Sequence, residues 1–334
     1  MIKAYAAYQV RESLRPFSYA PRELGDLDVE IAITHCGICH SDIHLINNDW
    51  GISQFPLVPG HEIVGNVTGI GKKVTELAVG DRVGVGWQCG SCFECVDCTH
   101  GDENLCASSH ATCVGNFGGY ADKVIVDSRF AFRIPESLDS AAAAPLLCGG
   151  ATVYSPMLKW KVGPGSRVGV IGIGGLGHLA IQFAKALGAE VTAFSSTPEK
   201  ELEARALGAD HFSVSTQASS AIVLKGYFDF IINTVWADLD WQGYVTLLRS
   251  NGVLCFVGLP GKPITIHAGM LLSGQKSITA SVIGSRKTIE SMLKLAASKG
   301  VGAKTELYPM SEVNRALEHA GSNKARYRVV LYND

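Results

Sequence analysis

The sequence predicts a mainly β domain followed by an α/β domain built on a doubly wound parallel sheet. Up to about residue 145, short alternating runs are interrupted by Gly and Pro, and no long amphipathic helix fits between them. Beyond that point, apolar runs of strand length alternate with helical stretches, which is typical of parallel strands joined by helices. The 334 residues also exceed the size, about 250–300 residues, at which one hydrophobic core stops growing.

Composition and charge exclude several classes of function. The formal net charge is −2, whereas a nucleic-acid-binding face would need a basic surplus. The N-terminal residues 1–5 lack the apolar core of a secretory signal, and polar or helix-breaking residues interrupt every long apolar run. We therefore expect a cytoplasmic protein with neither nucleic-acid nor membrane partners. Ten cysteines in such a chain indicate metal ligands and free thiols rather than disulfides.

The first domain shows a series of strand patterns. The segment 29–34 alternates polar and apolar residues, as a half-buried strand does. Further strands are expected at 62–70, 81–86 and 120–126. Many turns must join strands as short as these.

Two motifs near these strands carry metal-binding side chains. The first is Cys-His-Ser-Asp-Ile-His at 39–44, and the second is Gly-His-Glu at 60–62. Cys39 and His61 would supply a thiolate and an imidazole, and Cys148 is the best candidate for a third ligand. Catalytic zinc uses such a set of two cysteines and one histidine and keeps a fourth position for substrate. The alternative for Cys148, in its apolar run, is a small buried hydrophobic residue.

A separate group of cysteines predicts a second, structural zinc site. Four thiolates complete a tetrahedron and leave no position for substrate. Such a site is worth on the order of 10 kcal/mol in small peptides, enough to order a lobe, 88–107, that has little core. Cys89 also stands in CxxC spacing, but a tetrahedron has no place for a fifth thiol. The four predicted ligands, in a CxxCxxC run and the loop after it, are Cys92, Cys95, Cys98 and Cys106.

The second domain opens with a dinucleotide-binding pattern. A buried-strand run at 167–173 leads through a glycine-rich turn into a helical segment at 177–188. Between a strand and a helix, GxGxxG is the fingerprint that holds a pyrophosphate at a helix N-terminus. The residues of this turn are Gly172, Gly174, Gly175, Leu176 and Gly177.

Strands and helices then alternate along the rest of the chain. This alternation predicts the doubly wound sheet, with a final strand close to the C-terminus. Strands are expected at 190–195, 211–214, 228–233, 252–258, 277–282 and 324–331, and helices at 198–207, 287–299 and 311–320.

The end of the second strand of this domain decides the cofactor. An NAD-binding site places Asp or Glu there, about twenty residues beyond the glycines, to bond the ribose 2′-hydroxyl. This chain instead has hydroxyl groups and a cation, which suit a 2′-phosphate that a carboxylate would repel, and we therefore predict NADP(H). An ordinary helix cap beside a solvated lysine is a simpler explanation that can coexist with this role. The residues concerned are Ser195, Ser196, Thr197 and Lys200.

Together these motifs resemble those of the zinc-dependent medium-chain alcohol dehydrogenases, in particular the cinnamyl-alcohol-dehydrogenase-like branch of NADPH-dependent aldehyde reductases. The resemblance spans essentially the whole chain. It implies a GroES-like catalytic domain at 1–145, an inserted Rossmann domain at 146–285, and a return segment at 286–334. It also implies homodimers formed edge to edge by the Rossmann sheets, through 255–282.

The resemblance assigns roles around the catalytic zinc. Glu62 would alternate as a fourth ligand when substrate is absent. Ser41 would touch the substrate oxygen and pass a proton through the cofactor ribose to His44, because a hydroxyl donates and accepts and imidazole exchanges protons near neutral pH. Asp42 would bond the free nitrogen of His61, as the partners of metal-bound histidines do. Ser41 and Asp42 could instead cap a helix.

Substrate and cofactor contacts follow from the same resemblance. Four apolar positions match the family's substrate pocket and favour aromatic or aliphatic aldehydes. One of them, Trp50, could instead be a partly exposed packing residue. Thr152 matches a cofactor contact, and the choice between Arg326 and Arg328 for the pyrophosphate stays open. The pocket positions are Trp50, Ile52, Val282 and Ile283.

The sequence thus predicts reversible hydride transfer between NADP(H) and aromatic or aliphatic aldehydes or primary alcohols. One alternative is an NAD-dependent zinc polyol or sugar dehydrogenase, which Ser195 and the apolar pocket disfavour. A different class is a zinc-ribbon binding module with a degenerate nucleotide domain. The acidic balance and the ligands of the open zinc site argue against that class.

Overall fold

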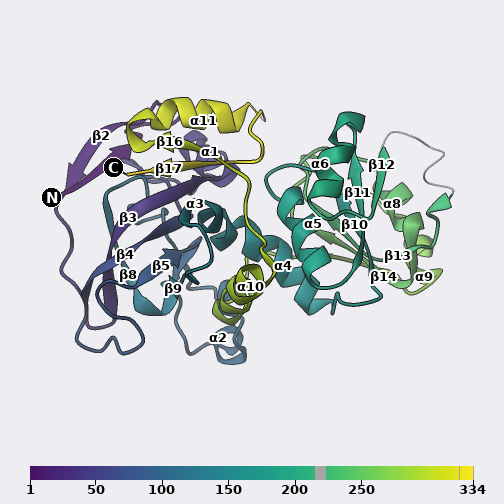
Figure 1. Cartoon of the computed structure of the whole chain (residues 1–334), viewed down its shortest axis with the longest axis horizontal. Coiled ribbons are helices and arrows are strands. Elements are labelled where there is room, and N and C mark those ends of the chain that lie inside the picture. The colour runs from purple at the N-terminus through teal and green to yellow at the C-terminus, as the bar shows by residue number, and fades with distance from the viewer. Residues whose placement is uncertain (215–222, 323, 334) are drawn as a thin grey trace. The chain divides into compact units, whose positions relative to one another are not determined.

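The computed structural model describes residues 1–214, 223–322 and 324–333 (Figure 1). The chain forms two compact units. Unit 1 combines Met1–Ala151 with Gly284–Asp334, and unit 2 is Thr152–Ile283. The sequence placed boundaries after residues 145 and 285, whereas the compact units change after Ala151 and Ile283. The C-terminal segment therefore packs with the first part of the chain.

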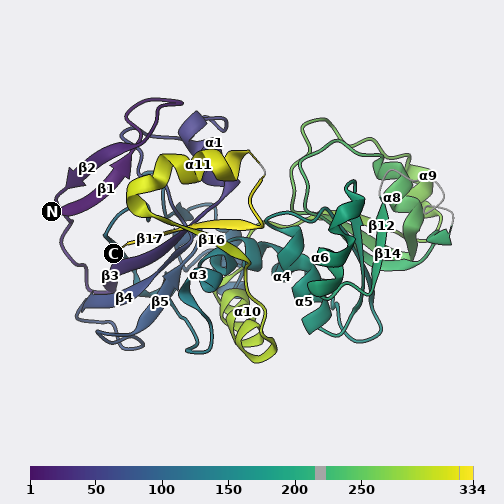
Figure 2. The same ribbon diagram turned by 45° about the horizontal axis from the view of Figure 1, so that its top comes forward.

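Unit 1 is built on a seven-stranded sheet whose strands come from both ends of the chain. β16 and β17 are parallel, and the other pairs are antiparallel. β17 pairs with β3, as Figures 1 and 2 both show, so the C-terminus lies beside the strand that leads to Cys39. The order is β16 (Thr305–Pro309), β17 (Arg328–Tyr332), β3 (Asp28–Ile38), β4 (Ile63–Ile70), β5 (Arg82–Val85) and β9 (Phe132–Arg133), with β8 (Lys123–Asp127) also paired to β3.

The alternation read from the sequence appears in β3 as alternating burial. Val29, Ile31 and Ile33 are buried in the core of unit 1, and the residues between them are partly exposed. Small two-stranded sheets and helices complete the unit. They are β1 (Ile2–Ala6) with β2 (Arg15–Tyr19), β6 (Gln88–Gly90) with β7 (His110–Ala111), and the helices α1 (His40–Asn47), α2 (Val96–His100), α3 (Ser140–Ala143), α10 (Arg286–Lys299) and α11 (Val313–Gly321).

Two asparagines hold the C-terminal segment against the first part of the chain. The side chain of Asn333 donates to the carbonyl oxygens of Ile33 and Ala121, each at 2.9 Å. Asn314 donates to Leu14 O at 2.9 Å and accepts from Leu14 N at 2.8 Å. These bonds satisfy backbone groups in the first part of the chain, and so they help the return segment to complete unit 1.

Unit 2 contains a six-stranded, fully parallel sheet, which confirms the predicted fold class. The strand order reverses between β10 and β13, and ligands of such sheets bind beyond the carboxyl ends of the strands at this point. The order is β12 (His211–Val214), β11 (Glu190–Ser195), β10 (Arg167–Ile171), β13 (Phe228–Asn233), β14 (Leu248–Phe256) and β15 (Ser277–Ala280). Helices α5 (Gly177–Ala186), α6 (Glu201–Ala206), α8 (Trp241–Leu247) and α9 (Ala268–Leu272) accompany it, and α4 (Gly149–Lys159) runs from unit 1 into unit 2.

Within the described residues, no single helix has the length and apolar character needed to span a membrane. Ser140–Leu147 and Gly149–Lys159 meet that test only as a pair, and the two helices are bent by 56° where they meet.

Candidate metal centres and dinucleotide turn

Four side chains from three distant segments converge in unit 1. The ligand atoms of Cys39, His61, Glu62 and Cys148 all lie within 4.8 Å of one another. Cys39 is the N-cap of α1, and His61 and Glu62 directly precede β4. Cys148 follows a 3₁₀ helix, Ala144–Leu147, just before α4. The fold thus gathers the residues that the sequence suggested as catalytic zinc ligands.

The geometry of this cluster fits a zinc ion. His61 and Glu62 are fully buried, yet His61 Nε2 and Glu62 Oε2 have no hydrogen-bond partner. A buried polar atom without a partner costs free energy, so such atoms call for a ligand. Two sulfurs, an imidazole nitrogen and a carboxylate oxygen are donors that zinc accepts.

Charge within the cluster favours a thiolate. A hydrogen bond from Cys148 holds the pKa of Cys39 well below its usual value, although burial acts in the opposite direction. The same contact and burial raise the pKa of Cys148. Zinc requires deprotonated cysteines, so metal binding would release the proton that Cys148 retains.

Asp42 orients the histidine of the cluster. Its Oδ1 accepts from His61 Nδ1 at 3.0 Å and from Gly60 N at 2.9 Å. Its Oδ2 accepts from Cys39 N at 2.9 Å and so caps α1. The helix-cap role and the histidine contact therefore coexist in one buried carboxylate. With Nδ1 engaged, Nε2 is the nitrogen that faces a metal.

Glu62 also faces a buried cation. Arg328, which is 5% exposed, donates to Glu62 Oε1 and to Ile38 O, the latter at 3.1 Å. Burial raises the pKa of Glu62 to about 7, and the positive charge of Arg328 opposes this rise. Of the two arginines that the sequence left open, the structure places Arg328 beside the metal cluster.

Ser41 and His44 lie on α1, close to the cluster. The Sγ atom of Cys39 lies 3.6 Å from Ser41 Oγ. His44 is 44% exposed at its side chain, and its Nδ1 bonds Asp49 Oδ2 at 2.8 Å. The hydrogen bond with His44 lowers the pKa of Asp49. Sequence reasoning missed Asp49, because nothing in its local pattern distinguishes it from a surface residue.

Two tryptophans stand beside these histidines. The ring of Trp87 meets that of His61 edge-on, with centres 4.9 Å apart. The ring of Trp50 lies 6.1 Å from that of Trp87 and 5.3 Å from that of His44. Sequence reasoning missed Trp87; its position directly after a predicted strand was the available signal. Ile52, 46% exposed, follows α1 in unit 1, whereas Val282 and Ile283 end unit 2.

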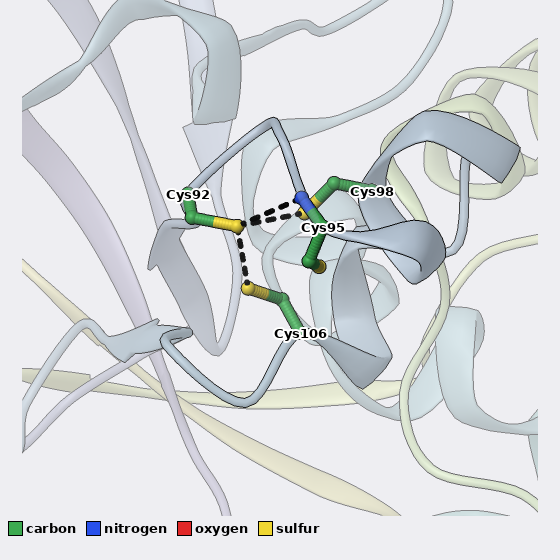
Figure 3. Close-up of side chains that lie close together, drawn as sticks. All are labelled: Cys92, Cys95, Cys98 and Cys106. Carbon is green, nitrogen blue, oxygen red and sulfur yellow. Dashed lines mark hydrogen bonds between the residues drawn. The ribbon is translucent and has the colours of Figure 1, made fainter.

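The predicted structural site also forms as a cluster. Cys92 Sγ lies 3.9 Å from Cys98 Sγ and 3.6 Å from Cys106 Sγ, and Figure 3 shows Cys92 reaching both. Zinc–sulfur bonds of about 2.3 Å would place tetrahedral sulfurs roughly 3.8 Å apart. Cys95 completes the group, which does not include Cys89. Backbone N–H groups of Glu94 and Cys95 lower the pKa of Cys92 to about 6, which favours the thiolate.

The glycine-rich turn of unit 2 fits a dinucleotide. Gly172 has φ +90°, and a Cβ there would lie 2.2 Å from Val235 Cγ1. A Cβ on Gly177 would lie 2.0 Å from Gly172 O, so close packing of α5 requires glycine. At Gly174, by contrast, no atom lies within 4 Å of the Cβ position. The turn is tight at its first and last glycines and open in the middle, where a pyrophosphate approaches.

The residues expected to select the cofactor surround this turn. Ser195 ends β11, and its buried hydroxyl accepts from Thr197 N at 3.1 Å. Ser196 is exposed. Lys200 Nζ donates to Ile173 O at 2.7 Å, which brings an ammonium group to the glycine turn. Ser195 thus bonds within its own turn, as the simpler explanation expects, and Lys200 provides the cation that the 2′-phosphate prediction needs.

Comparison with known proteins agrees with these sites. Residues 25–136 match the alcohol dehydrogenase GroES-like domain, and residues 175–298 match the zinc-binding dehydrogenase model. The aldehyde reductase AdhA of Synechocystis is 46% identical over 331 residues, which cover 99% of this chain and 98% of that protein.

Two solved structures are similar over almost the full chain. A cinnamyl alcohol dehydrogenase from Sorghum bicolor matches with a TM-score of 0.94 and 41% identity, covering 99% of this chain and 97% of that one. CAD from Helicobacter pylori, complexed with NADP(H), matches with a TM-score of 0.91 and 32% identity over the same shares. The chain therefore belongs to the zinc-binding medium-chain alcohol dehydrogenases, in their cinnamyl-alcohol-dehydrogenase-like branch.

Proposed function

We propose that this protein is a zinc-dependent aldehyde reductase that transfers hydride between NADP(H) and aromatic or aliphatic aldehydes or their primary alcohols. The observation that carries the proposal is the convergence of partly buried Cys39 with buried His61, Glu62 and Cys148. The Synechocystis relative, named as an aldehyde reductase, supports the reaction. The NADP(H) in the Helicobacter pylori structure supports the cofactor, and the small-molecule substrate follows from the family.

Each residue of the metal cluster has a distinct part in this proposal. Cys39, His61 and Cys148 would hold the ion, and Asp42 would keep the imidazole in the correct tautomer. Glu62 would either complete the coordination or turn to Arg328, whose charge offers the carboxylate a second stable partner. Zinc bound there would act as a Lewis acid on the substrate carbonyl.

Ser41 and His44 would handle the proton that reduction consumes. Ser41 Oγ lies beside the metal cluster and can donate to an oxygen that gains negative charge. His44 is half exposed, so its imidazole can exchange protons with water. Asp49 holds the ring through Nδ1, which leaves Nε2 available for that exchange.

The proposed substrate pocket is apolar and aromatic. Trp50 and Trp87 would form a wall beside the metal cluster and would favour flat or unbranched aldehydes. Polyols would bury several hydroxyl groups against such surfaces without partners, which is unfavourable. Ile52 of unit 1 is a further proposed lining residue, and Val282 and Ile283, which end unit 2, stay proposed substrate contacts.

Most of the proposed cofactor contacts belong to unit 2. Thr152 and the five residues of the glycine-rich turn would hold the dinucleotide, which would supply the hydride when bound. Ser195, Ser196, Thr197 and Lys200 would surround the 2′-phosphate. Their hydroxyl groups can donate to the phosphate oxygens, and the lysine neutralises part of its charge.

We also propose a homodimer that extends the sheet of unit 2. β15 is the last strand in the order of that sheet, and an edge strand presents unpaired backbone groups that a second copy can bond. Light scattering should therefore give twice the chain mass of 35.5 kDa. A mass of one chain at micromolar concentration would contradict this assembly.

Single cysteine substitutions should distinguish the functions of the two zinc sites. Cys148→Ser should reduce zinc from two ions to one per chain and lower NADPH-dependent benzaldehyde reduction by about 1,000-fold, because several kcal/mol of carbonyl polarisation is lost. Cys106→Ser, the matched variant, should lose the other ion and unfold at a lower temperature. Elemental analysis with steady-state assays checks both, and wild-type turnover by a Cys148→Ser protein with one zinc would refute the Lewis-acid role.

A carboxylate at the end of β11 should reverse the cofactor preference. Wild-type kcat/KM should favour NADPH over NADH, and Ser195→Asp should change that ratio by about 100-fold, because a carboxylate beside a phosphate costs several kcal/mol. The exposed Glu199→Gln serves as control. Equal efficiency of the wild type with both cofactors would contradict NADP(H) selection.

Faster oxidation of sorbitol with NAD than reduction of benzaldehyde with NADPH would favour a polyol dehydrogenase.

Loss of the Ser41 hydroxyl should slow the chemical step. Ser41→Ala should lower the single-turnover rate of aldehyde reduction by about 100-fold, as expected for general acid catalysis, with two zinc ions retained per chain. Ser41→Thr keeps the hydroxyl and should retain most of the rate. If the alanine variant reacts as fast as the wild type, Ser41 does not deliver the proton.

A further inference from the structure

The lobe at 88–107 that holds the four-cysteine cluster, called the zinc lobe below, contains a buried carboxylate that the proposed reaction does not use. Glu103 begins the 3₁₀ helix Glu103–Leu105 and is 5% exposed. Its Oε2 has no hydrogen-bond partner, and its Oε1 lies 3.6 Å from Nη1 of Arg286. A buried carboxylate needs a nearby cation, so this contact links the lobe to the start of α10.

Three further groups surround Arg286, the first residue of α10. Its Nε donates to Arg129 O at 2.7 Å. Its guanidinium carbon lies 5.6 Å from the ring centre of Phe93 and 5.9 Å from that of Phe130, within the range of cation–π attraction. The guanidinium of Arg129 covers the Phe93 ring as well, at 3.6 Å. Phe93 directly follows the ligand Cys92, so the zinc lobe and the start of α10 share one packed cluster.

α10 begins three residues after Ile283, the second of two neighbouring proposed substrate contacts. The chain re-enters unit 1 at Gly284, and Ser285 caps α10 by accepting from Thr288 N at 3.4 Å. The preceding residue, Ile283, has φ +39°. A β-branched residue rarely adopts this left-handed conformation, which persists only where the surrounding structure imposes it. One place where this conformation can be held is the C-terminal side of Ile283, where the chain leads into α10.

We propose that the zinc lobe positions Val282 and Ile283 for substrate binding, through the contact of Glu103 with Arg286. Only Gly284 and Ser285 separate Ile283 from Arg286, so a fixed Arg286 leaves the strained backbone little room to relax. Glu103 and Arg286 are positioning residues, because they act through the segment that precedes α10. The inference rests on the proposed function, in which Val282 and Ile283 contact the substrate.

Two variants of the zinc-loaded full-length enzyme test the contact. Arg286→Met keeps an unbranched side chain without the guanidinium, and Glu103→Gln keeps the shape without the charge. Lys294→Met, at an exposed position of the same helix, is the control. Four quantities are measured: zinc per chain, kcat and KM for benzaldehyde at saturating NADPH, the Kd of NADPH, and hydrogen exchange of the amides at 282–289.

Both variants should retain two zinc ions and bind NADPH as the wild type does. Their KM for benzaldehyde should rise and kcat/KM fall by about tenfold, less than the hundredfold that a misplacement of about 1 Å can cause. Exchange at 282–289 should accelerate in both variants, whereas Lys294→Met should match the wild type.

Unchanged KM and unchanged exchange in either variant with two zinc ions would overturn the proposal. Loss of the lobe zinc from both variants would overturn it too, because the contact would then only stabilise the lobe. If the wild type reduces no aldehyde, the proposed function fails by itself, and accelerated exchange in the variants still supports the restraint on Ile283.

Discussion

The carboxylate of Asp42 is the constraint on which the metal cluster depends. It is fully buried, and its three hydrogen bonds go to the N-cap of α1, to the turn at Gly60 and to the imidazole of His61. A carboxyl group at such depth is tolerated only when its oxygens are bonded. The hydrogen bonds that stabilise the buried Asp42 therefore also restrain the distance between Cys39 and His61. They leave Nε2 as the imidazole nitrogen that would face the metal.

The two candidate zinc clusters offer different donor atoms, and this difference gives them different chemical properties. Four thiolates around one ion, as at Cys92, would form a closed and inert site that orders a lobe. The other cluster includes Glu62, a carboxylate whose pKa is raised to about 7 and which has Arg328 as a second partner. A ligand with an alternative partner can leave the metal without becoming an unpaired buried charge. We therefore expect ligands to exchange at the site that contains Glu62 and not at the four-cysteine site.

Much of the fold could be predicted from the sequence, because local patterns determine it. β3 and the strands of unit 2 follow apolar periodicity, and the comparisons confirm the family, the fold class and the zinc- and NADP-dependent reaction. Long-range features were beyond reach. The eight residues of α1 are too few to show a helical period, and no local signal places Arg328 against Glu62 or Trp87 against His61. The roles of individual site residues stay predictions.

The pairing of β17 with β3 has a consequence for the order of assembly. During synthesis, β3 emerges first and unit 2 follows, while β17 and Arg328 emerge only after unit 2. Domains generally fold as they leave the ribosome. Unit 2 can therefore fold while the His35–Ile38 end of β3 still has a bare edge, the kind of edge on which chains aggregate. The nascent catalytic half is the vulnerable part, and any chaperone assistance would be needed there.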